Sequence, residues 1–188
     1  MCSACREAQK SSLDSLITAV SYEDLPPKKL VHNFKYRFVG DISLILAKFI
    51  CQALIRNDFP LPDFLVPVPL HPKRLRWRGF NQSFLLASRI SEELAPLTGV
   101  EILDILERKK FNRPQMQIQS YQERLQNMHN IFGLKTDTSS DLIKNKKILL
   151  IDDIATTGAT LEECAKVLKI AGAKKVFAAV VARQTLKK

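Results

Sequence analysis

Two adjacent carboxylates, Asp152 and Asp153, lead into a short stretch of small and hydroxyl-bearing residues that ends at Thr160. Carboxylates accept hydrogen bonds from vicinal hydroxyl groups, or they face a divalent cation. Threonine hydroxyls and the N–H groups of a tight turn donate to anions instead, and phosphate suits such a turn best. A diol next to a phosphate is the chemistry of a ribose phosphate, so the sequence predicts a site for a phosphorylated pentose.

The flanking residues predict how this site is positioned. Residues 148–151 are four consecutive apolar residues, which is typical of a strand buried on both faces. The threonines therefore lie between a strand and a helix N-terminus, where unpaired N–H groups and the positive end of the helix dipole converge. The helix is indicated by apolar residues at helical spacing, with Gly172 as its stop signal: Leu161, Cys164, Ala165, Leu168 and Ala171.

An apolar run before two aspartates also occurs in the Walker B segment of helicases and in the acidic pocket of response-regulator receivers. A Walker B site requires a P-loop, and the sequence contains no Gly-x-x-x-x-Gly-Lys. A receiver carries its acidic pair on an early strand, whereas this pair lies in the last quarter of the chain. Residues 148–160 instead resemble, position for position, the motif that binds 5-phosphoribosyl-1-pyrophosphate (PRPP) in type I phosphoribosyltransferases.

This resemblance implies that Asp152 and Asp153 bind the ribose 2- and 3-hydroxyls and that the loop after them wraps the 5-phosphate. It further implies that the segment after the first core strand, from Val68 to about Arg74, holds pyrophosphate, and that Mg²⁺ bridges pyrophosphate and ribose oxygens. Besides the two aspartates, the implied PRPP contacts are Val68, Pro69, Leu70, Ala155, Thr156, Thr157, Gly158, Ala159 and Thr160.

A second group of chemistry-bearing residues lies between positions 73 and 82, where four cations and two aromatic residues occur without an acidic one. Guanidinium groups hold phosphates in a bidentate fork, and aromatic rings stack on bases. A solvated basic turn with Trp77 packed on the surface explains the same composition equally well. The candidate nucleic-acid contacts are Lys35, Lys73, Arg74, Arg76, Trp77, Arg78 and Phe80.

An ordered set of segments covering about residues 17–183 is similar to the ComF family of competence proteins, also called ComFC or GntX-like. The set comprises residues 66–72, residues 78–82, Arg113 with Gln117, Glu123-Arg124 with Asn127, and the aspartate–threonine motif. The resemblance implies an N-terminal zinc ribbon joined to a phosphoribosyltransferase-like domain. It also implies a role in natural transformation, on incoming single-stranded DNA at the cytoplasmic side of the uptake machinery.

Three functions follow from these resemblances. The first is a DNA-handling protein with a pocket for PRPP or another phosphoribosyl ligand, which has the uptake machinery as its protein partner. The second is a metabolic enzyme that moves phosphoribosyl from PRPP to an unidentified acceptor, and the third is a PRPP-sensing regulator. If the ligand is turned over, the expected catalytic residues are Asp152 and Asp153 with Arg113 and Arg124, whose flexible segment closes over the leaving group.

The cysteines predict metal binding or core packing rather than a disulfide framework. Cys51 and Cys164 fall on apolar helix faces and are expected in the core. Cys2 and Cys5 have the C-x-x-C spacing of half a zinc ribbon, but tetrahedral Zn²⁺ takes four ligands, so the zinc site is incomplete. We therefore expect a partial zinc-ribbon segment at residues 1–15 and a phosphoribosyltransferase-like domain at residues 16–188.

The net charge of +10, from 29 basic and 19 acidic residues, favours an anionic partner. The longest apolar-rich segment, residues 42–55, is interrupted by Lys48 and Gln52 and is too short to cross a bilayer. The first residues lack the pattern of a secretory signal. These features predict no membrane span and a cytoplasmic location, at the inner face of the membrane if the uptake machinery is the partner.

Strand and helix patterns alternate along the chain, which predicts an α/β fold with a mostly parallel sheet and helices on both faces. Ligands bind such sheets at the carboxyl ends of the strands. Strands are expected at residues 16–22 (an edge strand), 63–68, 101–106, 147–152 and 175–182. Helices are expected from Asp41 as N-cap to Pro60 and Pro62, over residues 81–94 and up to residue 171, and a mobile loop at 108–130 with a possible short helix at 122–131.

Overall fold

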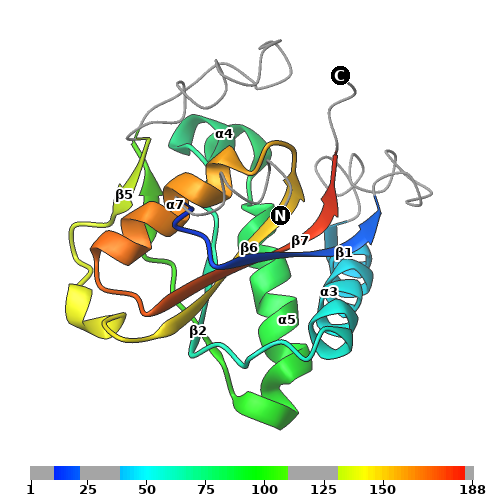
Figure 1. Cartoon of the computed structure of the whole chain (residues 1–188). Helices are drawn as coiled ribbons and strands as arrows, with labels where there is room; N and C mark the ends of the chain where they lie inside the picture. Colours follow the sequence, from blue (N-terminus) through cyan, green and yellow to red (C-terminus); the bar gives the residue numbers. More distant parts are fainter. Residues whose placement is uncertain (1–10, 22–38, 110–130, 185–188) are drawn as a thin grey trace.

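The computed structural model describes residues 11–21, 39–109 and 131–184. Five strands form one sheet in the order β1-β7-β6-β2-β3, and every neighbouring pair is parallel (Figure 1). The mostly parallel sheet and the edge position of the first strand are thereby confirmed. The strands are β1 (Ser15–Ser21), β2 (Phe64–Pro67), β3 (Glu101–Ile102), β6 (Lys147–Ala155) and β7 (Lys175–Arg183).

Helices cover both faces of the sheet, as predicted (Figure 1). On β6, Ile148 and Leu150 point to the side of α7 (Ala159–Ile170). Leu149 and Ile151 point to the side of α3 (Val39–Arg56) and α5 (Gln82–Thr98). All four side chains are fully buried, because a central parallel strand has no solvent face. Cys51 and Cys164 are buried in the two cores, as expected.

A small antiparallel hairpin was not predicted. The chain leaves the sheet after Ile102 and forms β4 (Leu106–Arg108), which pairs with β5 (Phe132–Leu134) on the α7 side. The single strand expected at residues 101–106 is therefore wrong, because Ile105 and Leu106 bury their side chains beneath α7 instead of extending the sheet. The 3-10 helix η3 (Ser140–Leu142) follows the hairpin.

Helix boundaries differ from the expectations at several ends. The helix expected to begin after Asp41 begins at Val39, and it ends at Arg56, before the prolines and just ahead of Asp58 with its left-handed φ of 46°. Asn81 does cap α5, but that helix runs through Pro96 to Thr98 and ends at Gly99, which has a φ of 57°. The apolar stripe marks where a helix touches the core, whereas the left-handed residue marks where it ends.

Residues 72–78, expected as part of a loop or basic turn, form a capped helix, α4 (Pro72–Arg78). Pro72 occupies the start of the helix, where its missing N–H costs nothing. The His71 Nδ1 accepts a hydrogen bond from the Lys73 N–H at 3.1 Å, and Gly79 ends the helix with a φ of 84°. None of the residues of α4 is buried, so the helix leaves no apolar stripe in the sequence.

The chain before β1 is anchored by Asp14. Its carboxylate lies 2.7 Å from the Lys169 Nζ and 2.8 Å from the Lys175 Nζ, and it accepts a hydrogen bond from the Val176 N–H at 2.8 Å. Partial burial alone would raise the pKa of Asp14, but these donors outweigh it and lower the pKa to about 2. The carboxylate thus ties β1 to both α7 and β7.

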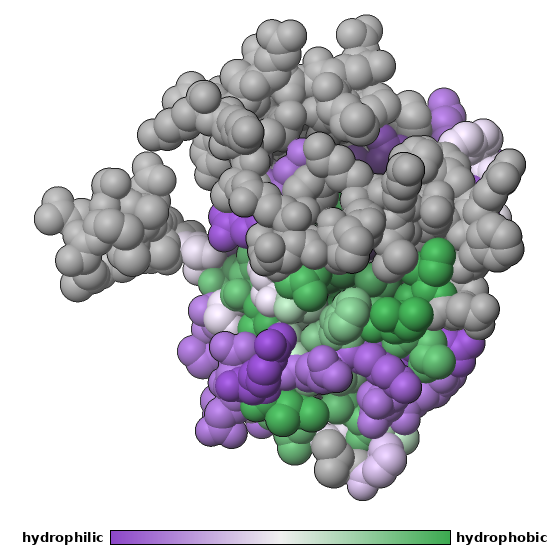
Figure 2. Space-filling view, turned by 90° about the vertical axis from the view of Figure 1, so that its right-hand side faces the viewer, coloured by the Kyte–Doolittle hydropathy of each residue, from purple (hydrophilic) through white to green (hydrophobic). Residues whose placement is uncertain are grey.

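Figure 2 shows the side of the molecule that carries α3 and β1, where apolar side chains gather on the surface. Leu44, Ile45 and Ile55 of α3 contribute exposed apolar side chains. Within the described ranges, no helix is long and apolar enough to cross a membrane.

Candidate phosphate and ribose site

The predicted phosphate loop is a tight turn between β6 and α7. β6 continues past both aspartates to Ala155, rather than ending at residue 152, because its pairing with β7 persists as far as Arg183. The turn itself is residues 156–158, and α7 begins at Ala159. Gly158 has a φ of 82°, a left-handed conformation that favours glycine, and its carbonyl accepts the Glu162 N–H at 2.9 Å.

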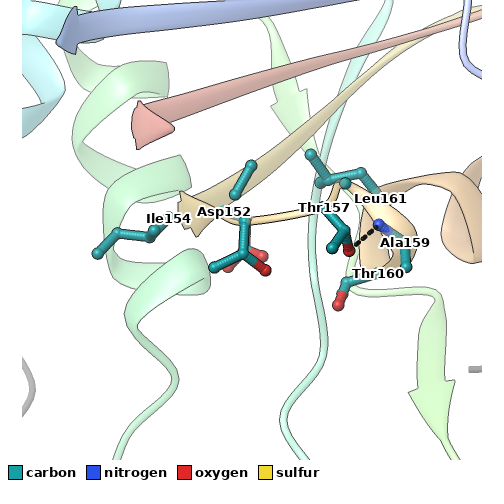
Figure 3. A pocket seen from close by; sticks show the side chains of 9 residues that line it. Asp152, Ile154, Thr157, Ala159, Thr160 and Leu161 are labelled. Atoms are coloured by element: carbon teal, nitrogen blue, oxygen red, sulfur yellow. Dashed lines mark hydrogen bonds between the residues drawn. The ribbon is translucent and has the colours of Figure 1, made fainter. Parts of the chain in front are cut away.

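The turn borders a small hollow that is partly open to solvent. Of the residues that line it, Ala155 and Ala159 are buried, whereas the hydroxyl-bearing residues of the turn are half-buried. In Figure 3, Asp152 and the side chains of Thr157 and Thr160 lie around this hollow. The Thr157 Oγ1 accepts the Ala159 N–H at 3.3 Å, which holds the turn against the helix. Asp152 and residues 154–161 line the hollow.

The acidic pair is held by hydrogen bonds from two elements. Asp152 Oδ1 accepts the Ser83 hydroxyl at 2.9 Å and the Asp153 N–H at 2.9 Å. Asp153 Oδ1 accepts the Ile154 N–H at 2.7 Å. Ser83 lies in the first turn of α5 and is 4% exposed, so its hydroxyl is a fixed donor. Sequence reasoning missed Ser83, although the Asn81 N-cap placed it at a helix start.

The predicted pyrophosphate segment lies beside the acidic pair. The Val68 N–H donates to the Ile151 carbonyl at 3.0 Å, and the Val68 carbonyl accepts the Asn81 Nδ2 at 3.1 Å. Val68 and Pro69 are buried, and Leu70 is half-buried. Since proline has no N–H and the Val68 N–H is already bonded, backbone donors for an anion in this segment start at Leu70.

The predicted nucleic-acid residues of the described chain gather on and just after α4. Lys73, Arg76 and Trp77 are exposed, and Trp77 is 70% exposed. Arg74, Arg78 and Phe80 are half-buried. Residues 72–78 form a capped helix rather than a turn, and the binding of nucleic acid by these side chains stays a prediction.

Arg108, which sequence reasoning did not single out, also belongs to this region. Burial lowers the pKa of its guanidinium, and the neighbouring Arg74 lowers it further, whereas Cys164 and Asp152 raise it. His71 experiences the same positive surroundings. Desolvation lowers the pKa of His71, and Arg108 and the cations of α4 add to this effect. The charge of Arg108 thus interacts both with Arg74 of α4 and with Asp152 of the acidic pair.

Several predicted residues lie outside the described residues: Lys35, Arg113, Arg124, Cys2 and Cys5. The zinc segment and its boundary at residue 15 remain predictions. Within the described ranges, no group of three or more His, Cys, Asp or Glu residues could hold a metal ion. Two adjacent carboxylates nevertheless fit Mg²⁺ that arrives on a diphosphate, because Mg²⁺ is commonly held by one or two carboxylates together with substrate phosphates.

Comparisons with known proteins identify the domain and its relatives. The family Phosphoribosyl transferase domain matches residues 81–187. Competence protein F of Haemophilus influenzae is 30% identical over 172 residues, covering 89% of this chain and 72% of that protein. Competence protein ComFC of Streptococcus pneumoniae is 38% identical over 144 residues, covering 76% and 57%. DNA utilization protein YhgH of Salmonella typhi is 30% identical over 164 residues, covering 85% and 68%.

Solved structures resemble the chain more distantly. The match to purine phosphoribosyltransferase from Pyrococcus horikoshii covers 77% of this chain and 86% of that enzyme's chain, at 17% identity and a TM-score of 0.43. The match to glutamine PRPP amidotransferase from B. subtilis covers 74% of this chain and 26% of that enzyme's chain, at 17% identity and a TM-score of 0.47. Both TM-scores lie below 0.5.

The parallel sheet, the turn at the start of α7 and the family match define a phosphoribosyltransferase-like domain. Relatives named for competence or DNA utilization narrow this class. The chain belongs to the ComF family of competence proteins, as its sequence predicted. It spans 57% of the length of the pneumococcal relative.

Proposed function

We propose that the chain binds PRPP or a related phosphoribosyl ligand in the hollow between β6 and α7, and that it handles incoming single-stranded DNA through the basic surface of α4. One observation carries the ligand half of this proposal. The carboxyl end of β6 brings Asp152 and the threonines of the turn to the same hollow, at the N-terminus of a long helix. Carboxylate oxygens that can accept hydrogen bonds from a diol thus lie next to N–H and hydroxyl groups that can donate hydrogen bonds to a phosphate.

Each group in the hollow has a defined role in this proposal. The turn and the N-terminus of α7 receive the 5-phosphate, because their N–H and hydroxyl groups donate and the helix dipole favours an anion. Asp152 and Asp153 accept hydrogen bonds from the ribose hydroxyls. When Mg²⁺ is bound with a diphosphate, it neutralises charge on the phosphate oxygens, and the same two carboxylates would hold it. Arg113 and Arg124 keep their predicted role at the leaving group.

The DNA half rests on α4 and on the relatives. α4 buries none of its own residues, so core packing does not explain its cations or Trp77. Exposed cations next to an exposed indole are suited to single strands, because phosphates pair with the cations and bases stack on the ring. The relatives' names refer to competence and DNA utilization. We place the protein in the cytoplasm at the inner face of the membrane, with the DNA-uptake machinery as its partner.

Titration calorimetry with ribose 5-phosphate and with Mg²⁺–PRPP tests the ligand half. The double variant D152N/D153N is expected to lose at least about tenfold in affinity, because hydrogen bonds to charged acceptors are lost. The variant D137N/D141N is a matched control, since it removes two exposed carboxylates away from the hollow. No heat with either ligand for the wild-type protein would refute a phosphoribosyl site.

Two further measurements separate the functions. Oligonucleotide binding that weakens steeply with salt supports the DNA half, and absence of binding at low salt refutes it. The family match to a phosphoribosyl transferase domain favours a second candidate, a metabolic phosphoribosyltransferase. PRPP-dependent release of pyrophosphate with one base from a panel would support that enzyme, whereas PRPP binding without release would count against it.

A further inference from the structure

Arg108 is a half-buried cation without an ionic partner among the described residues. It is the last residue of β4 and lies opposite Phe132 of β5. Its guanidinium carbon lies 5.5 Å from the centroid of the Phe132 ring, and its Nε is buried without a hydrogen-bond partner. No carboxylate of the described chain lies within ion-pair distance of Arg108. Partial burial makes the charge of a guanidinium less favourable unless an anion compensates it, so this geometry points to a ligand.

The surroundings of Arg108 indicate where that anion binds. Arg74 of α4 and Asp152 of β6 are both close enough to act electrostatically on Arg108. Arg108 does not line the hollow around the threonine turn, whose lining runs from Asp152 to Leu161. It therefore meets a part of the ligand other than the group in the turn. Leu106 and Phe132 of the hairpin pack in the same core cluster as Val68, so the hairpin lies on the side of the sheet where the predicted pyrophosphate segment begins.

We propose that Arg108 binds the diphosphate of the phosphoribosyl ligand, as a second anion contact that is separate from the threonine turn. This inference rests on the proposed function and adds one residue, from the hairpin, to the site. The face of the guanidinium lies over the Phe132 ring, which leaves the N–H groups at its edge to bind two phosphate oxygens at once.

A diphosphate fits better here than the backbone of a DNA strand. A strand that passes along the surface of α4 meets Lys73 and Arg76, which are exposed. Arg108 is half-buried and its Nε is fully enclosed, so a compact ligand that is already anchored in the hollow reaches it more readily. A free pyrophosphate ion carries the same chemistry and serves as a probe of this contact alone.

The test compares three ligands with wild-type protein and three variants in calorimetric titrations. The ligands are ribose 5-phosphate, Mg²⁺–pyrophosphate and Mg²⁺–PRPP, and the variants are R108A, R108K and R56A. Arg56 ends α3 and is exposed, so R56A makes the same change in net charge away from the site. R108A is expected to lower the affinity for pyrophosphate and for PRPP by about 10- to 100-fold. Its affinity for ribose 5-phosphate should change by less than about twofold. R56A is expected to bind all three ligands with wild-type affinity.

The lysine variant keeps the test decisive if R108A does not fold. Lysine keeps the charge and an apolar stem but lacks the fork, so R108K should lose affinity for pyrophosphate and PRPP while keeping affinity for ribose 5-phosphate. Wild-type affinity for pyrophosphate in folded R108A and R108K overturns the inference, as does an equal loss for all three ligands. If the wild-type protein binds neither ribose 5-phosphate nor PRPP, the proposed function itself has failed. If the wild-type protein binds ribose 5-phosphate but neither pyrophosphate nor PRPP, only the inference about Arg108 has failed.

Discussion

Replacing Ser83 with alanine removes a single hydroxyl donor from the acidic pair. The Ser83 Oγ donates to Asp152 Oδ1 at 2.9 Å, and the serine is 4% exposed. A hydrogen bond to a charged acceptor contributes about 1.5–3 kcal/mol when its partner is left unsatisfied. Asp152 is half-buried and keeps the Asp153 N–H at 2.9 Å, so water and this remaining donor offset part of the loss.

We therefore expect S83A to lower the free energy of unfolding by about 1 kcal/mol and the affinity for ribose 5-phosphate by about 3- to 10-fold. The stability change reflects the lost bond, whereas the affinity change reflects a carboxylate that no longer keeps its orientation toward the hollow. Urea unfolding measures the first quantity, and calorimetric titration measures the second.

Ser88 of the same helix provides the matched control. Its hydroxyl donates to the Phe84 carbonyl at 3.1 Å, within α5 and away from the acidic pair. S88A should change stability by less than about 0.5 kcal/mol and leave ligand affinity unchanged. If S83A binds ribose 5-phosphate as tightly as S88A does, the hydroxyl of Ser83 does not position Asp152 and the reasoning fails.

Three further predictions concern the turn, the N-terminal anchor and α4. G158A should lose about 1 kcal/mol of stability in thermal unfolding, because the added Cβ meets no atom within 4 Å and only the left-handed φ of 82° is strained; an unchanged midpoint contradicts this. The pKa of the Asp14 carboxylate is lowered from 3.8 to about 2. Its ionised form should therefore add about 1 kcal/mol to the free energy of unfolding at neutral pH, a value reduced from the full shift because the group is partly exposed to solvent. Wild type and D14N should therefore differ in unfolding free energy above about pH 4 and converge as the pH falls toward 2; a constant difference would be inconsistent with this linkage. W77A should weaken the binding of single-stranded DNA by about 1–3 kcal/mol, measured by fluorescence anisotropy, and should unfold at the same denaturant concentration as the wild type. Equal affinity of W77A and wild type for the strand would show that the exposed indole does not stack on bases.

The sheet and its helices were predictable because their signals are local. Residues 148–151 are apolar without interruption because both faces of β6 are covered, and the helical spacing after Gly158 matches the buried face of α7. By contrast, α4 buries none of its residues, so periodicity contains no trace of it. Its start and end signals, Pro72 and Gly79, were present in the sequence, and they were the better guide.

The candidate site was predictable to the extent that it is continuous in sequence. Asp152, Asp153 and the threonine turn occur together in the sequence, and the structure places Asp152 and the turn around one hollow, although the ligands of these residues remain predictions. Ser83 contacts Asp152 across 69 positions, and Arg108 lies in a hairpin that was not predicted, at a position expected to begin the mobile loop. Such contacts depend on how the chain folds back, which no local pattern records.

The hairpin of β4 and β5 has a consequence for how this family can diversify. The Lys109 N–H donates to the Ile131 carbonyl at 2.7 Å, so the fold itself joins the two ends of residues 110–130. The entropic cost of closing an inserted segment grows only with the logarithm of its length. A change in the length of the segment between these two positions therefore costs the rest of the domain little stability, because the hairpin keeps the two ends of that segment joined.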